Sequence, residues 1–163
     1  MQLSIPDLED YLSRLAELLE RYGVVLDLED TAPLGLDESP SGVMSFELRG
    51  FLPDGRIPPL SIIEVRERWR RLARDQVERW EYEFELLDNE RGFRRAFHLH
   101  DGELFVRNYQ VVAHGHCEGP IGTAPCAHVA DSPVRDGYRG VDLVIETWID
   151  PSPPDCPKVD CLE

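Results

Sequence analysis

Histidine and cysteine side chains gather in two stretches of this sequence, and both residue types bind metals or take part in catalysis. The stretch "HGHCEGPIGTAPCAH", residues 114–128, holds three of the five histidines and two of the four cysteines. The other two histidines stand upstream in "FRRAFHLH", residues 93–100. The residue types leave three alternatives open: a metal site, a catalytic site, and a loop that happens to be rich in histidine.

The stretch 114–128 has enough candidate ligands for zinc, which takes four nitrogen or sulfur ligands in a tetrahedron. The candidates are His114, His116, Cys117, Cys126 and His128. The spacing is not that of a zinc finger or ribbon, because the sequence has no C-x2-C step. We therefore expect either one structural zinc ion or no cofactor, with buried thiols and hydrogen-bonded histidines in a loop. Two further cysteines, Cys156 and Cys161, could add ligands.

The stretch 93–100 lies in an expected β-hairpin whose two-residue turn is Asp101-Gly102. Opposed residues of a hairpin share a face. Strands 93–100 and 103–112 then place Phe97 and Val106 on the core face. Pairing Phe84 of the preceding strand with Phe97 puts Glu83 beside His98. The opposite, polar face collects the candidate catalytic residues His98, His100, Arg94, Arg107, Glu83 and Tyr109.

This polar face has the parts of a metal-independent endoribonuclease that uses the RNA 2'-hydroxyl as nucleophile. Two imidazoles with pKa values near neutrality act as general base and general acid. Arginines stabilise the extra negative charge of a phosphorane, and a glutamate orients one imidazole. Two alternatives remain: a solvated surface of Glu–Arg and Glu–His pairs, and a divalent-metal site formed by the same glutamates and histidines.

The two histidine stretches are expected to form separate groups. His114 lies nine residues beyond Phe105, so a straight strand would carry it about 30 Å from His98 at roughly 3.3 Å per residue. Only a sharp reversal of the chain before His114 would bring the groups together.

The hydrophobic periodicity predicts an α+β fold: an antiparallel β-meander sheet with two helices packed on one face. One helix spans 4–22, capped by Ser4 and stopped by Gly23, and a second spans 61–80 with an arginine-rich solvated face that includes Arg66. Strands are expected at 43–51, 81–87, 93–100, 103–112 and 141–149, with a loop at 114–140. Residues 1–150 form a single domain, followed by a tail at 151–163 that contains proline and cysteine.

Length and charge narrow the class of protein. A chain of 163 residues favours one domain, and a net charge of -15 argues against sequence-independent coating of DNA. No apolar run approaches the roughly 20 residues that span a bilayer, and the N-terminus lacks the features of a secretory signal. The sequence therefore predicts a cytoplasmic protein without a membrane partner, whose cysteines are thiols or metal ligands rather than disulfides.

The segment "YEFELLDNERGFRRAFHLHDGE" resembles the TumE-type toxins of bacterial toxin–antitoxin pairs. The matching residues are Tyr82, Phe84, Asp88, Gly92, Arg94, His98 and His100, and the resemblance covers at most residues 43–117. It implies a toxin that acts on RNA inside the cell and is neutralised by an antitoxin protein. The alternative function is a non-enzymatic interaction or regulatory module, either stabilised by zinc or acidic enough to occupy a basic partner surface.

Overall fold

A computed structural model describes residues 1–27, 37–53, 61–99, 113–118, 128–130 and 134–149. The predicted strand 103–112, the turn at 101–102 and the tail at 151–163 lie outside this part of the chain. The elements, in chain order, are β1 (Gln2–Ser4), α1 (Ile5–Arg21), β2 (Val25–Leu26), β3 (Asp37–Glu38), β4 (Val43–Phe51), β5 (Ser61–Ala73), β6 (Gln76–Asp88), β7 (Phe93–Leu99), β8 (Ala113–Glu118), β9 (His128–Ala130) and α3 (Gly137–Ile149).

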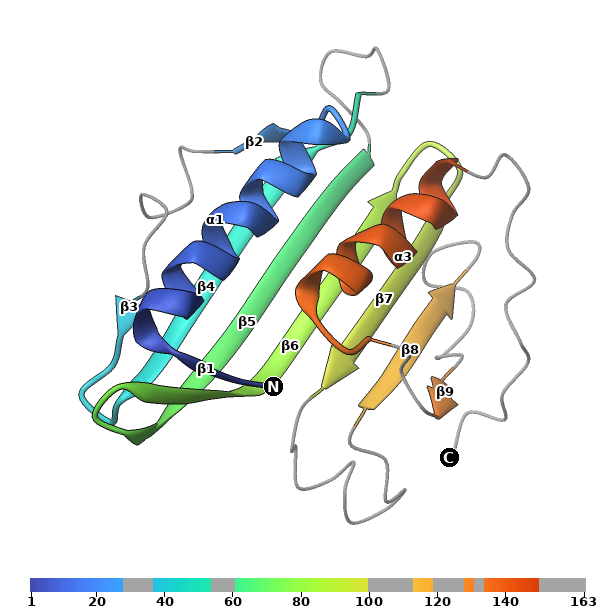
Figure 1. The fold of residues 1–163 in the computed structure, drawn as a ribbon. Coiled ribbons are helices and arrows are strands. Elements are labelled where there is room, and N and C mark those ends of the chain that lie inside the picture. The colour runs from blue at the N-terminus through green and yellow to red at the C-terminus, as the bar shows by residue number, and fades with distance from the viewer. Residues whose placement is uncertain (28–36, 54–60, 100–112, 119–127, 131–133, 150–163) are drawn as a thin grey trace.

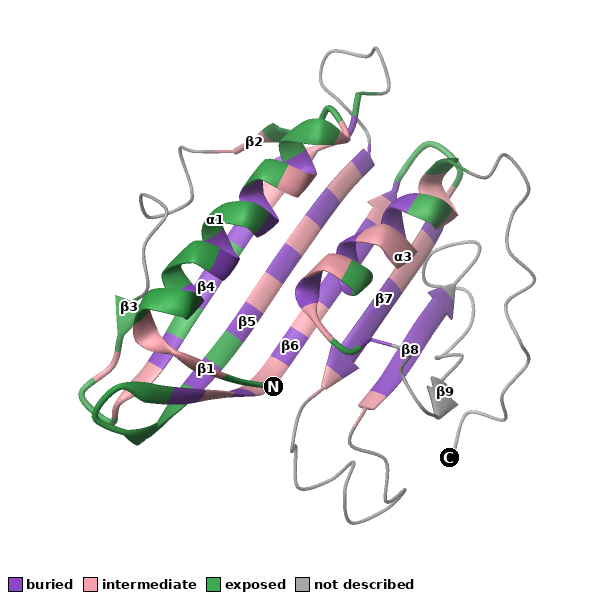
Figure 2. Ribbon diagram, viewed as in Figure 1, coloured by how far each residue is buried: buried purple, intermediate pink, exposed green. Residues whose placement is uncertain are grey.

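The strands form one antiparallel sheet in the order β2-β4-β5-β6-β7-β8-β9, with β1 paired to β6 and β3 paired to β4. Helices α1 and α3 lie side by side on one face of it (Figure 1). The core lies between this helix-covered face and the helices, and buried and partly exposed residues alternate along β5 (Figure 2). The predicted α+β class, with an antiparallel sheet and two helices on one face, is confirmed. The opposite face of the sheet is called the outer face below.

The first helix begins and ends where its sequence predicts. Ser4 has extended backbone angles, and its hydroxyl oxygen accepts a hydrogen bond from the backbone N–H of Asp7 (3.2 Å). Gly23 follows the helix with a φ of 79°, a conformation that glycine adopts without steric cost. The apolar side chains of α1, spaced three and four residues apart, face the sheet.

The predicted helix at 61–80 is wrong, because this segment forms β5 and the first part of β6. Ile63, Val65 and Trp69 are buried, whereas Arg66 and Arg68 on the other side of the strand are more exposed. The spacing of Ile62, Val65 and Trp69 also fits a helix, so the local pattern was ambiguous. Pairing with β4 and β6 on both sides decides for the strand, because β-branched residues pack well in a central strand.

The C-terminal predictions are also corrected. The segment 141–149, predicted as a strand, belongs to helix α3, whose buried residues Gly137, Gly140, Val141, Val144 and Ile145 recur at helical spacing. The predicted loop at 114–140 contains β8, β9 and the start of α3. Hydrophobic content indicated structure at 141–149, but a short apolar segment does not distinguish a strand from a buried helix.

Helix α3 packs closely on the sheet because Gly140 has no side chain. A Cβ atom at Gly140 would lie 2.6–2.8 Å from ring atoms of Phe84, which is fully buried in β6. We expect Gly140→Ala to lower the free energy of unfolding by about 1–2 kcal/mol, because overpacking outweighs the gain in helix propensity. Urea denaturation measures this change. The control Glu146→Ala, at an exposed site on the same helix, should shift stability by less than about 0.5 kcal/mol. If Gly140→Ala has the same free energy of unfolding as the wild type, the close packing of α3 on Phe84 is contradicted.

A buried polar network joins both helices to the sheet. Glu67, on the helix-covered face of β5, accepts hydrogen bonds from the hydroxyl of Tyr11 (2.8 Å), the indole N–H of Trp69 (3.2 Å) and the guanidinium of Arg79 (2.9 Å). The same Tyr11 hydroxyl accepts a hydrogen bond from the backbone N–H of Gly137 at the start of α3 (2.8 Å). The network therefore fixes where α1 and α3 sit on the sheet.

Within the described ranges, no helix has both the length and the apolar character required to cross a membrane.

Candidate metal centre

Strand register places three histidines on the outer face of the sheet. Phe84 pairs with Phe97, as predicted, and lies on the helix-covered face against Gly140. The neighbouring pair, Glu83 and His98, therefore lies on the outer face. His98 in turn pairs with His114 of β8. His116 pairs with Ala96, two residues before His98, so it belongs to the same face.

The three imidazoles contact one another. Ring centroids are 4.6 Å apart for His98 and His116, 4.8 Å for His114 and His116, and 5.5 Å for His98 and His114. One nitrogen of each ring lies within 4.8 Å of those of the other two. Nitrogen ligands of a tetrahedral zinc lie roughly 3.4 Å apart, so small rotations of the rings bring all three to one ion. The relative exposures of His98, His114 and His116 are 9%, 1% and 8%.

The prediction of two separate histidine groups is therefore wrong for His98, His114 and His116. Strand β8 runs antiparallel to β7, so the chain reverses direction between Leu99 and Ala113. The separation assumed a straight strand beyond Phe105 and a direct pairing of 93–100 with 103–112. This predicted pairing is wrong, because β7 pairs with β6 on one side and with β8 on the other. The reversal returns His114 to a position directly opposite His98.

The predicted zinc ligands divide into three sets. His114 and His116 lie in the cluster. Cys117 points to the other face of β8, where it packs with Phe93, and it is disulfide-bonded. It therefore offers no thiolate on the outer face, and the expectation of free thiols is corrected at this position. His128 is the register partner of His116 in β9; nothing is described of its side chain, and Cys126 lies outside the described residues.

Two glutamates of β6 extend the cluster on the side of His98. Glu83 lies 3.4 Å from His98 Nε2, and Glu85 lies 3.9 Å from the same nitrogen. Arg94 holds Glu85 through two hydrogen bonds of 2.8 and 3.1 Å. Arg66 binds Glu83 at 3.3 Å, together with two further carboxylates on β4 and β5. The predicted residues Glu83, Arg94 and His98 are thus neighbours, whereas His100, Arg107 and Tyr109 lie outside the described residues.

The two carboxyl groups have different proton affinities. Burial raises the pKa of Glu83, and its hydrogen bond with Glu85 raises it further. Burial acts in the same direction on Glu85, but the hydrogen bonds and positive charge of Arg94 outweigh it, so the pKa of Glu85 is lowered. Such a divergence is the usual consequence of two carboxyl groups in contact. Of the two carboxyl groups, Glu83 is therefore the one that takes up a proton first as the pH falls.

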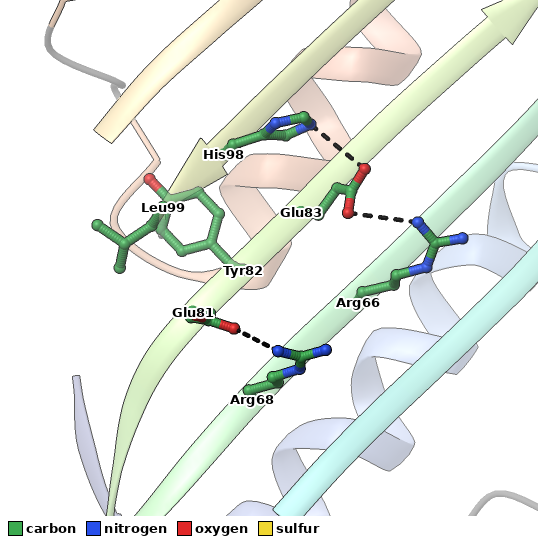
Figure 3. A pocket seen from close by; sticks show the side chains of 7 residues that line it. All are labelled: Arg66, Arg68, Glu81, Tyr82, Glu83, His98 and Leu99. Carbon is green, nitrogen blue, oxygen red and sulfur yellow. Dashed lines mark hydrogen bonds and ion pairs between the residues drawn. The ribbon is translucent and has the colours of Figure 1, made fainter. Parts of the chain in front are cut away.

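A pocket of about 180 Å³ opens beside the cluster, and Figure 3 shows its lining. Among the three clustered histidines, His98 alone lines it. The pocket also exposes two cross-strand ion pairs, Arg66–Glu83 and Arg68–Glu81. His98 is therefore the part of the cluster that borders this pocket. The remaining lining residues are Tyr82 and Leu99.

The sequence contained signals for parts of the arrangement that the predictions missed. His114 and His116 form an H-x-H step, and alternation alone places both on one face of a strand. Glu85 lies two residues after Glu83 on β6, so alternation places both on the same face. Arg66 was assigned to the solvated face of a helix, so its place at Glu83 followed only from the strand.

No family model, curated protein or solved structure matches the chain.

Proposed function

We propose that the protein binds one transition-metal ion, zinc in the first place, between His98, His114 and His116. The observation that carries the proposal is the convergence of three imidazole nitrogens from two neighbouring strands within 4.8 Å. Imidazole nitrogen suits zinc, copper, iron and nickel, whereas magnesium and calcium prefer oxygen. This ligand set replaces the cysteine-containing set expected from the sequence.

We further propose that the ion activates water for hydrolysis. Structural zinc sites are closed by four protein ligands, whereas catalytic sites combine three with an open position for water. Three histidines beside a solvent-connected pocket fit the second class. A metal-bound water loses its proton far more readily than bulk water, which supplies a nucleophile at neutral pH.

Elemental analysis of protein purified without a histidine tag tests the metal proposal. We expect about one zinc per chain in the wild type and none in His114→Ala or His98→Gln. The matched control is Arg70→Ala, an exposed substitution on the same outer face that should retain the ion. Circular dichroism verifies that each variant folds. A metal-free wild type after incubation with zinc, or full loading of the histidine variants, would reject the centre.

A second candidate function is the metal-independent ribonuclease, with RNA as substrate and an antitoxin as partner. The supporting observation is that Glu83 and His98, an adjacent acid–base pair, line the same pocket as Arg66. An RNA-cleavage assay in excess chelator separates the two candidates. Cleavage that survives the chelator and disappears in His98→Ala supports the ribonuclease, whereas cleavage that needs added zinc supports the metal-dependent enzyme.

The cytoplasmic location also stays a proposal, and a disulfide at Cys117 is more typical of an oxidising compartment.

A further inference from the structure

The pocket beside the metal centre is lined by charged groups of both signs. Two guanidinium groups, Arg66 and Arg68, face two carboxyl groups, Glu81 and Glu83. The side chains alone are therefore close to electrical balance. A divalent ion at the neighbouring histidines makes the pocket positive, because an ion is often the largest local charge in such a site. The occupied pocket then favours a negatively charged ligand.

The two arginines differ in how firmly they are held. Arg66 contacts three carboxylates, Glu47 at 2.9 Å, Glu64 at 2.7 Å and Glu83 at 3.3 Å, and these contacts fix it in place. Arg68 binds Glu81 at 2.9 Å, and its side chain is 60% exposed. Exposed ion pairs of this kind contribute little to stability, so Arg68 can exchange its partner at small cost.

We propose that the pocket binds an oxyanion group, a phosphate or a carboxylate, whose oxygen takes the open position of the metal while Arg68 turns from Glu81 to bind it. This inference rests on the proposed metal centre and names the ligand class of that site. A planar guanidinium matches the paired oxygens of both groups. The volume of about 180 Å³ accommodates such a group and a small part of the molecule that carries it.

Cobalt-substituted protein provides the test, because the visible absorption of tetrahedral Co²⁺ changes when its fourth ligand changes. The full chain is loaded with Co²⁺ and titrated with sodium phosphate or sodium acetate at constant ionic strength. We expect a saturable spectral change with at least one of the two anions. Phosphate alone identifies a phosphate ligand, acetate alone a carboxylate ligand, and both together the shared oxyanion chemistry.

Two matched variants separate a specific role of Arg68 from general electrostatics. In Arg68→Ala we expect the apparent dissociation constant of the anion to rise about tenfold, as for loss of one charge-assisted hydrogen bond. Arg70→Ala removes a similarly exposed arginine on the same strand, which pairs with Glu78 outside the pocket lining. This variant should leave the dissociation constant of the anion unchanged. Both substitutions lie in exposed ion pairs, so we expect both variants to fold.

The outcomes distinguish the two proposals. Absence of any cobalt spectrum contradicts the metal centre and, with it, the anion site. A cobalt spectrum that neither anion alters contradicts the anion site alone. Equal weakening in Arg68→Ala and Arg70→Ala also overturns it, because the effect would then be one of net charge.

Discussion

Glu67→Gln is expected to lower the free energy of unfolding by about 3–5 kcal/mol, because it leaves the buried guanidinium of Arg79 without its counter-charge. The side chains of Arg79 and Glu67 are only 4% and 0% exposed, so water cannot replace the lost partner. If the glutamine oxygen faces Tyr11 and Arg79, its amide N–H2 faces the indole N–H of Trp69, donor against donor. Both effects leave a buried polar group without its partner, and this lowers the free energy of unfolding.

Chemical denaturation monitored by tryptophan fluorescence measures the change. The matched control is Glu47→Gln, which also removes one carboxylate from an arginine on the sheet, but at the exposed pair with Arg66. That control should cost about 0.2–1 kcal/mol. Burial raises the pKa of Glu67 despite its bonds to Arg79 and Tyr11. A cost below about 1 kcal/mol for Glu67→Gln would contradict the inference that the buried Glu67–Arg79 ion pair is important for stability.

Zinc is expected to raise the melting temperature of the wild type by roughly 5–10 °C when it is present at about one hundred times its dissociation constant. Such an excess contributes about 2.7 kcal/mol to the folded state, because the ligands converge only after β7 and β8 have paired. Differential scanning calorimetry measures the shift. Excess chelator should reverse it, and magnesium should not reproduce it, because magnesium prefers oxygen ligands.

The histidine variants make this second experiment specific. His114→Ala should melt at the same temperature with and without zinc, because it removes the most deeply buried of the three rings. Arg70→Ala should keep the wild-type shift. If His114→Ala keeps the full shift, the stabilising zinc binds elsewhere in the chain. If the wild type shows no shift, the three histidines do not form a metal centre.

The local sequence determined those features that depend on neighbouring residues. The cap of α1 at Ser4, the stop at Gly23 and the strand Val43–Phe51 all follow from short-range pattern. The register of Phe84 with Phe97 followed from one requirement, that both aromatic rings reach the core. That register also placed Glu83 beside His98, which is the part of the site that the sequence predicted.

Only the tertiary structure decided whether segments with ambiguous hydrophobic patterns form helices or strands. Residues 61–80 carry apolar side chains that suit both a helix and a strand, and pairing with β4 and β6 satisfies their backbone groups as strands. The same pairing buries Glu67, and it brings Arg66, which had been assigned to a solvated helix face, to the site. The segment 141–149 is helical because its buried side chains recur at helical spacing and pack on the sheet, and Gly137 and Gly140 allow close contact with Tyr11 and Phe84.

The proposed metal centre depends on a contact between two strands that lie far apart in the sequence. His98 and His114 are separated by fifteen intervening residues, of which 100–112 lie outside the described structure. The sequence showed the residue types and their alternation. The alternation determines which side chains share a face once two strands pair. The chain reversal that makes β8 the neighbour of β7 set the pairing, because register between strands is determined by long-range burial rather than by local propensity.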